Sequence, residues 1–113
     1  VGSVLNVADT ALTPQQWHCI VSQLQKASIQ ATGIPCIYGL DMNHGANYAI
    51  GATILPHNIN MAATFNSALV RRGAEITAYE TRACDVPWTF NPTVDLSRNP
   101  LWPRVFENFG EDA

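Results

Sequence analysis

The most isolated charge in this 113-residue sequence is the carboxylate of Asp41, the only formal charge between Lys26 and Arg71. Asp41 directly follows the apolar run 34–40, which predicts a buried strand. An unpaired carboxylate in an apolar interior costs several kcal/mol, so this side chain must lie in a cleft or be bound by partners. Asp41 is therefore the first candidate for a binding site. On position alone, a structural role in a turn or as a helix cap stays open.

Cysteine and histidine, the usual metal ligands, do not cluster in this sequence. They are Cys19, Cys36, Cys84, His18, His44 and His57. No Cys-x-x-Cys pair occurs, and the histidines lack the four-residue helical spacing of zinc motifs. We therefore expect no disulfide framework, no metal and no cofactor, and we interpret the cysteines as small buried side chains.

The composition predicts one globular core. Hydrophobic residues make up 47% of the chain and the net charge is −3. Only 13% of residues are charged, against about 25% in ordinary soluble domains, so we expect another segment to cover part of the surface. The six scattered basic residues argue against a nucleic-acid partner. The uncharged segment 42–70 is broken by Asn, Gly, His and Pro, which argues against a membrane span.

Two strands and a helix are predicted in the first half of the chain. The apolar stretch 4–7, which ends at Ala8-Asp9, predicts a strand, and a second strand is expected near 35–40. Between them, Thr13 predicts a helix N-cap, with Pro14 at the first helical position and Gln16 as capping-box partner. The helix should present one apolar face, formed by Trp17, Ile20, Val21, Leu24 and Ala27.

The second half repeats this alternation after a connection of about 24 residues, which is too apolar for disorder and predicts an ordered loop. Asn66 predicts the N-cap of a helix over 67–83, and 86–90 predicts a third strand. We expect the inward side chains of this helix to be Leu69, Ile76, Tyr79 and Ala83. Strand–helix alternation predicts an α/β fold with a parallel sheet, in which reacting groups lie where strands end, as Asp41 does.

Several ordered motifs resemble glycoside hydrolase family 3, the family of many β-glucosidases. The segment 95–112, DLSRNPLWPRVFENFGED, resembles the family signature RDPRWGR…E…(F/Y)GED. GLDMNHG at 39–45 resembles its G-x-D-x-x-H-G, and ATILPHN at 52–58 resembles its AT-x-FP. The resemblance runs through essentially all 113 residues. It implies one domain, 1–113, which is part of an N-terminal (β/α)8 TIM-type barrel and holds about its first three strand–helix units.

The resemblance also implies the site residues. In the family, the aspartate of D-x-x-H-G and the first arginine of R-D-P-R-W hold hydroxyls of the sugar whose bond is broken, and these positions are Asp41 and Arg98 here. A carboxylate accepts hydrogen bonds from hydroxyls, whereas a guanidinium donates them, so the two types complement each other. The alternative for Arg98 is a structural ion pair with Asp95 or Glu107.

The remaining residues of the last motif are assigned structural roles. We interpret Trp102 as packing and expect Arg104 and Glu107 to staple the loop to itself. Three positions depart from the family pattern, namely Asn99, Leu101 and Pro103. Contacts made by the family's side chains at those positions are therefore in doubt, while Arg98 is retained.

The sequence lacks the catalytic pair that retaining glycosidases require. The resemblance places the nucleophile in a Ser-Asp motif on a later strand and the acid/base beyond the barrel, and no Ser-Asp pair occurs here. We therefore expect no catalytic residue in this polypeptide. Its parent should hydrolyse β-glucosides or related β-linked sugars, and its partners should be that carbohydrate, the rest of the barrel and a C-terminal domain.

Other interpretations remain open at this point. A non-catalytic sugar-binding or assembly module of the same ancestry would show the same motifs. A nucleotide-binding domain would need a GxGxxG or GK[ST] loop, which is absent. The chain opens on Val1 without a leader, as a piece of a longer protein would. Its residues do not reveal a localisation, and the resemblance alone implies a periplasmic or secreted protein.

Overall fold

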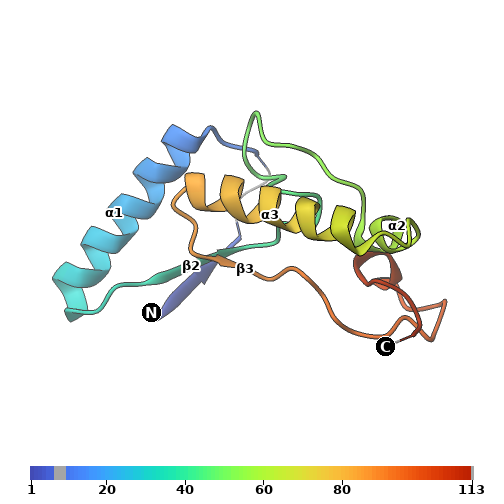
Figure 1. Ribbon diagram of the computed structural model, residues 1–113. Helices are drawn as coiled ribbons and strands as arrows, with labels where there is room; N and C mark the ends of the chain where they lie inside the picture. Colours follow the sequence, from blue (N-terminus) through green and yellow to red (C-terminus); the bar gives the residue numbers. More distant parts are fainter. Residues whose placement is uncertain (7–9, 113) are drawn as a thin grey trace.

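The computed structural model describes residues 1–6 and 10–112 and shows a small parallel sheet with helices on one side (Figure 1). In chain order the elements are β1 Ser3–Leu5, α1 Pro14–Thr32, β2 Ile37–Leu40, α2 Asn58–Ala62, α3 Ser67–Ala83, β3 Trp88–Thr89 and a 3-10 turn, η1, at Val105–Glu107. Strand, helix, strand, helix and strand alternate as the sequence predicts. The α/β class is therefore confirmed.

The strands pair in the order β1-β2-β3, and both pairings are parallel. In register, Leu5 lies beside Gly39 and Gly39 beside Trp88. β2 and β3 are shorter than the sequence predicts. The predicted end of the first strand, Val7 to Asp9, lies outside the described residues.

Helix α1 begins where its capping residues predict. The Thr13 hydroxyl accepts a hydrogen bond from the Gln16 backbone N–H at 3.3 Å, and the Gln16 side chain accepts one from the Thr13 N–H at 2.9 Å. This reciprocal pair satisfies N–H groups that no helical carbonyl can reach. The buried face of α1 is narrower than predicted, because Trp17 and Val21 are buried while Ile20 and Ala27 are exposed.

Helix α3 has the predicted bounds and the predicted cap, with the Asn66 side chain accepting from the Leu69 N–H at 3.0 Å. Its predicted inward face is wrong except at Ile76, which is partly buried. Leu69 is 56% exposed, Tyr79 is 78% exposed and Ala83 is exposed, while the buried residues are Gly73, Thr77 and Thr81. A Cβ built on Gly73 would lie 3.4 Å from both the Leu55 and Met61 side chains. At Gly73 the preceding connection therefore packs against α3 where a longer side chain would meet Leu55 and Met61.

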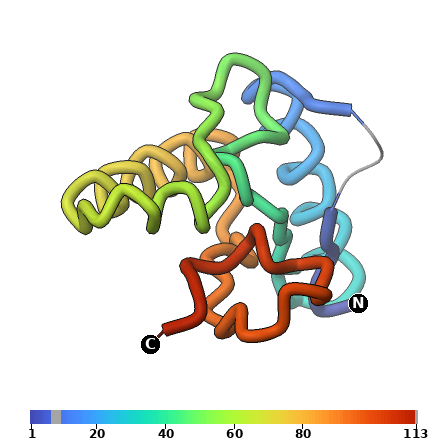
Figure 2. The backbone as a smooth tube through the Cα atoms, turned by 90° about the vertical axis from the view of Figure 1, so that its right-hand side faces the viewer, coloured from blue at the N-terminus to red at the C-terminus, as the bar shows by residue number. Residues whose placement is uncertain are grey.

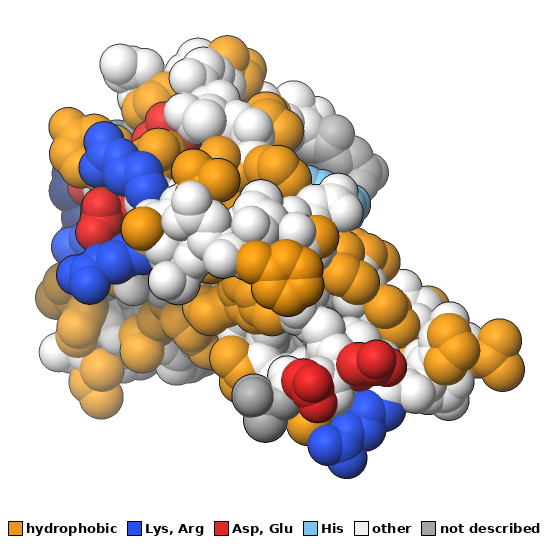
Figure 3. Space-filling model, turned by 45° about the vertical axis from the view of Figure 1, so that its right-hand side comes forward, with side chains coloured by type: hydrophobic (Ala, Val, Ile, Leu, Met, Phe, Trp, Pro, Cys, Tyr) orange, Lys and Arg blue, Asp and Glu red, His pale blue; other side chains and the backbone are white. Residues whose placement is uncertain are grey.

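The two faces of the sheet differ in burial, because successive side chains of a strand point to opposite faces. Tyr38 and Leu40 face the helices and join the buried core, which includes Trp17 and Val21 of α1. On the opposite face, Ile37 is 52% exposed and Trp88 is 44% exposed. An apolar face is thus left uncovered within the described residues. Figure 3 likewise shows hydrophobic side chains over much of the surface, with charged side chains in separate patches.

The long connection between β2 and α3 is ordered, as predicted, but it also contains the short helix α2, which the sequence analysis missed. Its anchors come from both long helices. The Trp17 indole N–H donates to the Tyr48 carbonyl at 2.9 Å, and the Glu80 carboxylate accepts from the Thr53 N–H and hydroxyl, both at 2.9 Å. These bonds hold the connection against α1 and α3.

After β3 the chain crosses the end of the molecule as an irregular segment that includes η1 (Figure 2). The three cysteines are free thiols; Cys36 and Cys84 are buried as predicted, whereas Cys19 is exposed. No helix among residues 1–6 and 10–112 is long and apolar enough to cross a membrane.

Candidate functional site

Asp41 is the first residue after β2 and is partly buried. The next helix begins only at Asn58, so Asp41 does not cap a helix. Within the described chain, its carboxylate forms no hydrogen bond or ion pair with another side chain. The side chain therefore lies at the carboxyl end of a parallel strand, the position at which such folds carry their reacting groups.

The loop that follows Asp41 is fixed by a tight approach to the next part of the connection. Gly45 has φ +75°, and a Cβ at this position would lie 2.2 Å from the Thr53 carbonyl oxygen. The His44 carbonyl accepts from the Leu55 N–H at 2.9 Å, and the His44 ring lies 3.2 Å from the Leu55 carbonyl through Nδ1. Only glycine fits at position 45, and the turn it permits holds the loop after Asp41 in place.

Arg104 and Glu107 form the bidentate pair that the sequence predicts as a loop staple. The Arg104 Nε donates to Glu107 Oε1 at 2.8 Å, and Nη2 donates to Oε2 at 2.6 Å. Glu107 is only 7% exposed. Hydrogen bonding to Arg104 lowers the pKa of Glu107, against the opposing effect of burial, so this carboxyl stays ionised.

The negative charge of Asp41 also affects the pKa of the Arg104 guanidinium. Its pKa lies above the usual value, first because Glu107 accepts its hydrogen bonds, and further because of the negative charges of Asp41 and Asp95. No hydrogen bond joins Arg104 to Asp41 in the described residues. The charge of Asp41 thus acts on the Arg104 guanidinium, and the Asp41 carboxylate retains capacity for further hydrogen bonds.

Arg98, the second residue that the sequence predicts for the site, lies on the exposed segment after β3. Its backbone N–H donates to the Leu96 carbonyl at 2.9 Å. In the described part of the chain no carboxylate lies within ion-pair distance of its guanidinium, so the alternative ion pair with Asp95 or Glu107 is not formed. No hydrogen bond or ion pair links it to Asp41 either.

Two histidines and a phenylalanine pack beside the Arg104–Glu107 pair. The rings of His44 and His57 lie 3.9 Å apart between centroids, and His57 lies 4.6 Å from Phe106. His57 Nδ1 is buried and has no hydrogen-bond partner among the described residues. Burial, assisted by His44, lowers the pKa of His57, so this ring is neutral near pH 7 and adds no positive charge to the site.

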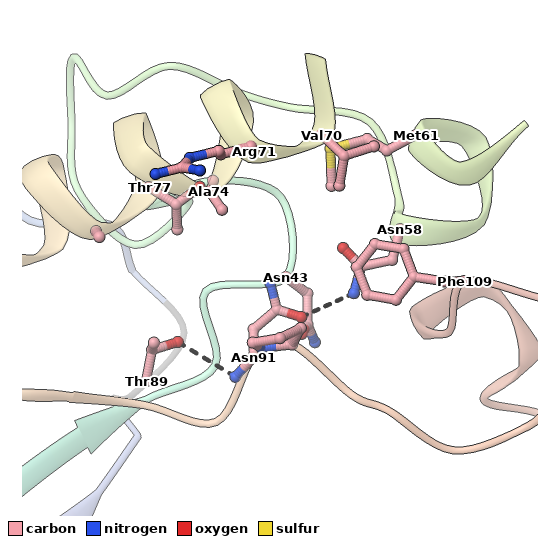
Figure 4. A pocket seen from close by; sticks show the side chains of 13 residues that line it. Asn43, Asn58, Met61, Val70, Arg71, Ala74, Thr77, Thr89, Asn91 and Phe109 are labelled. Carbon is pink, nitrogen blue, oxygen red and sulfur yellow. Dashed lines mark hydrogen bonds between the residues drawn. The ribbon is translucent and has the colours of Figure 1, made fainter. Parts of the chain in front are cut away.

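A pocket of about 250 Å³ lies between α3 and the segment that follows β3 (Figure 4). Its walls include the apolar side chains of Met61 and Val70, and three amides line it, namely Asn43, Asn58 and Asn91. Figure 4 shows a hydrogen bond between Asn58 and Asn91, and its length is 2.8 Å. The amides come from three separate segments, which therefore meet at this pocket.

The sequence analysis missed two features of this region, the effect of the Asp41 charge on Arg104 and the amide pair. The i, i+3 spacing of Arg104 and Glu107 was a visible signal for their pairing. Nothing in the local sequence indicates that the charge of Asp41 acts on Arg104, because the two residues belong to loops far apart along the chain. Asn91 resembled an ordinary turn residue before Pro92.

Comparison with known proteins agrees with this geometry. All of residues 1–113 match the family described as Glycosyl hydrolase family 3 N terminal domain. The chain is 44% identical over 98 residues to a lysosomal beta glucosidase of Dictyostelium discoideum, covering 85% of this chain and 12% of that protein. It is 34% identical over 91 residues to a periplasmic beta-glucosidase of Salmonella typhimurium, covering 80% and 11% respectively.

A solved structure shows the same fold. The chain superposes on the crystal structure of an exo-1,3/1,4-beta-glucanase from a Pseudoalteromonas species with a TM-score of 0.85 and 33% identity, covering 98% of this chain and 15% of that one. The chain thus spans only a small fraction of these proteins' lengths. The sequence motifs, the parallel sheet and the match over every residue agree, and the chain belongs to glycosyl hydrolase family 3, as part of its N-terminal domain.

Proposed function

We propose that this chain is part of a retaining glycoside hydrolase that acts on β-glucosides or related β-linked sugars, and that it supplies Asp41 and Arg98 to the sugar subsite. The observation that carries the proposal is the position of Asp41. It is a partly buried carboxylate at the carboxyl end of β2, in a chain whose relatives are β-glucosidases.

The chemistry of the two residue types supports sugar binding. A carboxylate has acceptor sites for two neighbouring hydroxyls, and a guanidinium offers donors in a rigid fork. Arg98 is exposed on a loop and has a guanidinium free of carboxylate partners in the described chain, so its donors are available to a ligand. The charge of Asp41 contributes to raising the pKa of Arg104, but Glu107 already occupies two of the Arg104 donors.

The architecture supports a partial barrel of about three strand–helix units. The helix-covered face of the sheet holds the core, while the opposite face exposes Ile37 and Trp88. In a closed barrel the inner face of each strand is covered by the other strands, and a complete barrel needs about 250 residues. The remaining strands of the parent would therefore cover this apolar face.

The catalytic pair belongs to other parts of the parent in this proposal. Retaining hydrolysis requires two carboxylates about 5–5.5 Å apart. The buried Glu107 is bound to Arg104 and Asp41 has no carboxylate partner in the described residues, which supports roles in positioning and binding. The 113-residue chain alone would then be inactive. The parent would also carry a C-terminal domain and would be periplasmic or secreted, as the periplasmic relatives suggest.

The test is Asp41→Ala in the full-length parent, assayed on an aryl β-glucoside. We expect kcat/KM to fall at least about tenfold, which corresponds to about 1.4 kcal/mol, because bonds to sugar hydroxyls strengthen in the oxocarbenium-like transition state. Arg98→Ala should lower the same quantity. Glu75→Gln is the matched control, since Glu75 is a carboxylate on the solvent-exposed face of α3. Unchanged kinetics in Asp41→Ala would remove the proposed role.

A further inference from the structure

A chain of amide hydrogen bonds connects the two loops that carry the charges of the candidate site. The Asn58 Nδ2 group donates to Asn91 Oδ1 at 2.8 Å and to the Glu107 carbonyl at 2.6 Å. Asn91 Nδ2 then donates to the Met42 carbonyl at 3.3 Å. The chain therefore runs from Met42, the residue after Asp41, to Glu107, the residue that binds Arg104.

The orientation of each amide follows from its acceptors. Asn58 is 1% exposed and faces two oxygens, those of Asn91 and Glu107, so it must present its NH₂ group to them. Asn91 consequently presents its oxygen to Asn58, which leaves its own NH₂ for the Met42 carbonyl. The backbone N–H of Asn91 also donates to the Thr89 hydroxyl at 3.3 Å, which ties this residue to the end of β3. Asn91 thus contacts the exit of β2 through its side chain and the end of β3 through its backbone N–H, and Figure 4 shows the bond to Thr89.

The amide hydrogen bonds lie beside the packed rings of His44, His57 and Phe106, which also connect the loop after β2 to η1. Met42 is fully buried, and Asp41 is only partly buried. The backbone of β3 continues the sheet as far as the Phe90 N–H, which donates to the Leu40 carbonyl at 3.2 Å. Beyond that bond, the hydrogen bond from the Asn91 side chain to the Met42 carbonyl joins the segments that follow β3 and β2. The Asn91 side chain therefore helps to fix the position of the Asp41 backbone relative to η1 and Arg104.

We propose that Asn91, oriented by Asn58, is a positioning residue that sets the spacing between Asp41 and the Arg104 loop for sugar binding. This inference rests on the proposed function. The alternative is that the amides only hold the loops together for stability. The two differ in a measurable way, because a positioning effect disappears once Asp41 itself is removed, whereas a stability effect does not.

The experiment is a double-mutant cycle in the full-length parent with an aryl β-glucoside as substrate. Asn91→Ala should lower kcat/KM about tenfold to a hundredfold, the range expected when a binding group moves by about 1 Å. In an Asp41→Ala background the same change should lower kcat/KM less than about twofold. Asn60→Ala is the matched control, because Asn60 is exposed on α2, two residues from Asn58, and should leave kcat/KM unchanged.

Each outcome decides the question. An equal loss in both backgrounds, or no loss in either, would overturn the positioning role while leaving the proposed function intact. Wild-type kinetics in the single Asp41→Ala variant would remove the proposed function and this inference with it. If Asn91→Ala does not fold, Asn91→Leu takes its place in the cycle, since leucine keeps the volume and removes both hydrogen bonds, and its unfolding temperature is recorded beside its kinetics.

Discussion

Gly45 offers a sharp test of the geometry around Asp41. The residue has φ +75°, and a Cβ built on it would lie 2.2 Å from the Thr53 carbonyl oxygen. Gly51 has a similar φ of +87° but no heavy atom within 4 Å of its built Cβ. Alanine at either position has the same backbone penalty, whereas only alanine at 45 collides with another part of the chain.

The expected magnitudes follow from this difference. A left-handed conformation costs an alanine about 1–2 kcal/mol, so Gly51→Ala should destabilise the domain by about that amount. Gly45→Ala has this cost and must also displace a backbone carbonyl by roughly an ångström, because real Cβ contacts are not closer than 3.0 Å. Since Thr53 is held by two bonds to Glu80, this displacement is resisted, and we expect a total of about 4 kcal/mol or more.

The assay compares both variants with the wild-type parent by calorimetry and by kcat/KM. At about 2–4 °C for each kcal/mol in a domain of barrel size, Gly51→Ala should lower the midpoint of unfolding by about 2–8 °C and leave kcat/KM nearly unchanged. Gly45→Ala should lower the midpoint by more than about 8 °C and reduce kcat/KM, because the loop after Asp41 moves. Equal midpoints for the two variants would refute the inferred contact with Thr53.

Two further predictions concern stability. Burial lowers the pKa of His57 below its ordinary 6.5, and hydrogen bonding to Arg104 lowers that of Glu107 below 4.5. The unfolded chain therefore binds more protons than the native one in acid, and the midpoint of unfolding should fall as pH drops below about 6.5, and again below about 4.5. His57→Phe should weaken the first step, and a midpoint that stays constant from about pH 7.5 to 4 would contradict both assignments. Separately, Thr13→Ala should lower the free energy of unfolding, measured in urea, by about 0.5–2 kcal/mol because it removes the cap of α1. Thr13→Ser keeps the hydroxyl and should lower it less. Equal losses in the two variants would exclude the capping bond.

Local structure was predictable wherever the deciding contacts are close in sequence. Thr13 and Gln16 are three residues apart and satisfy each other, so the start of α1 follows from the sequence whatever packs nearby. The Asn66 cap of α3 has the same property. Asp41 was likewise placed correctly at a strand end, because an isolated charge after an apolar run is a local pattern.

Tertiary contacts overrode the hydrophobic pattern of α3. Leu69 and Tyr79 were expected inside because they are apolar, yet the helix buries Gly73 and Thr77. A Cβ built on Gly73 already reaches the Leu55 and Met61 side chains of the neighbouring connection, so a long side chain at this position would meet them. Hydrophobic periodicity predicts which side chains favour burial, but it holds no information about how near the opposing surface lies.

The sequence by itself determined the family, the alternation of strands and helices, the helix starts and the place of Asp41, because each depends on residues close together in the chain. Only the tertiary structure decided that Asn58 reaches both Asn91 and Glu107 and that Asn91 connects the loops after β2 and β3. These contacts join segments that parallel strand pairing brings together. Because a helix separates these segments along the chain, the sequence near one side chain does not indicate which side chain it will contact.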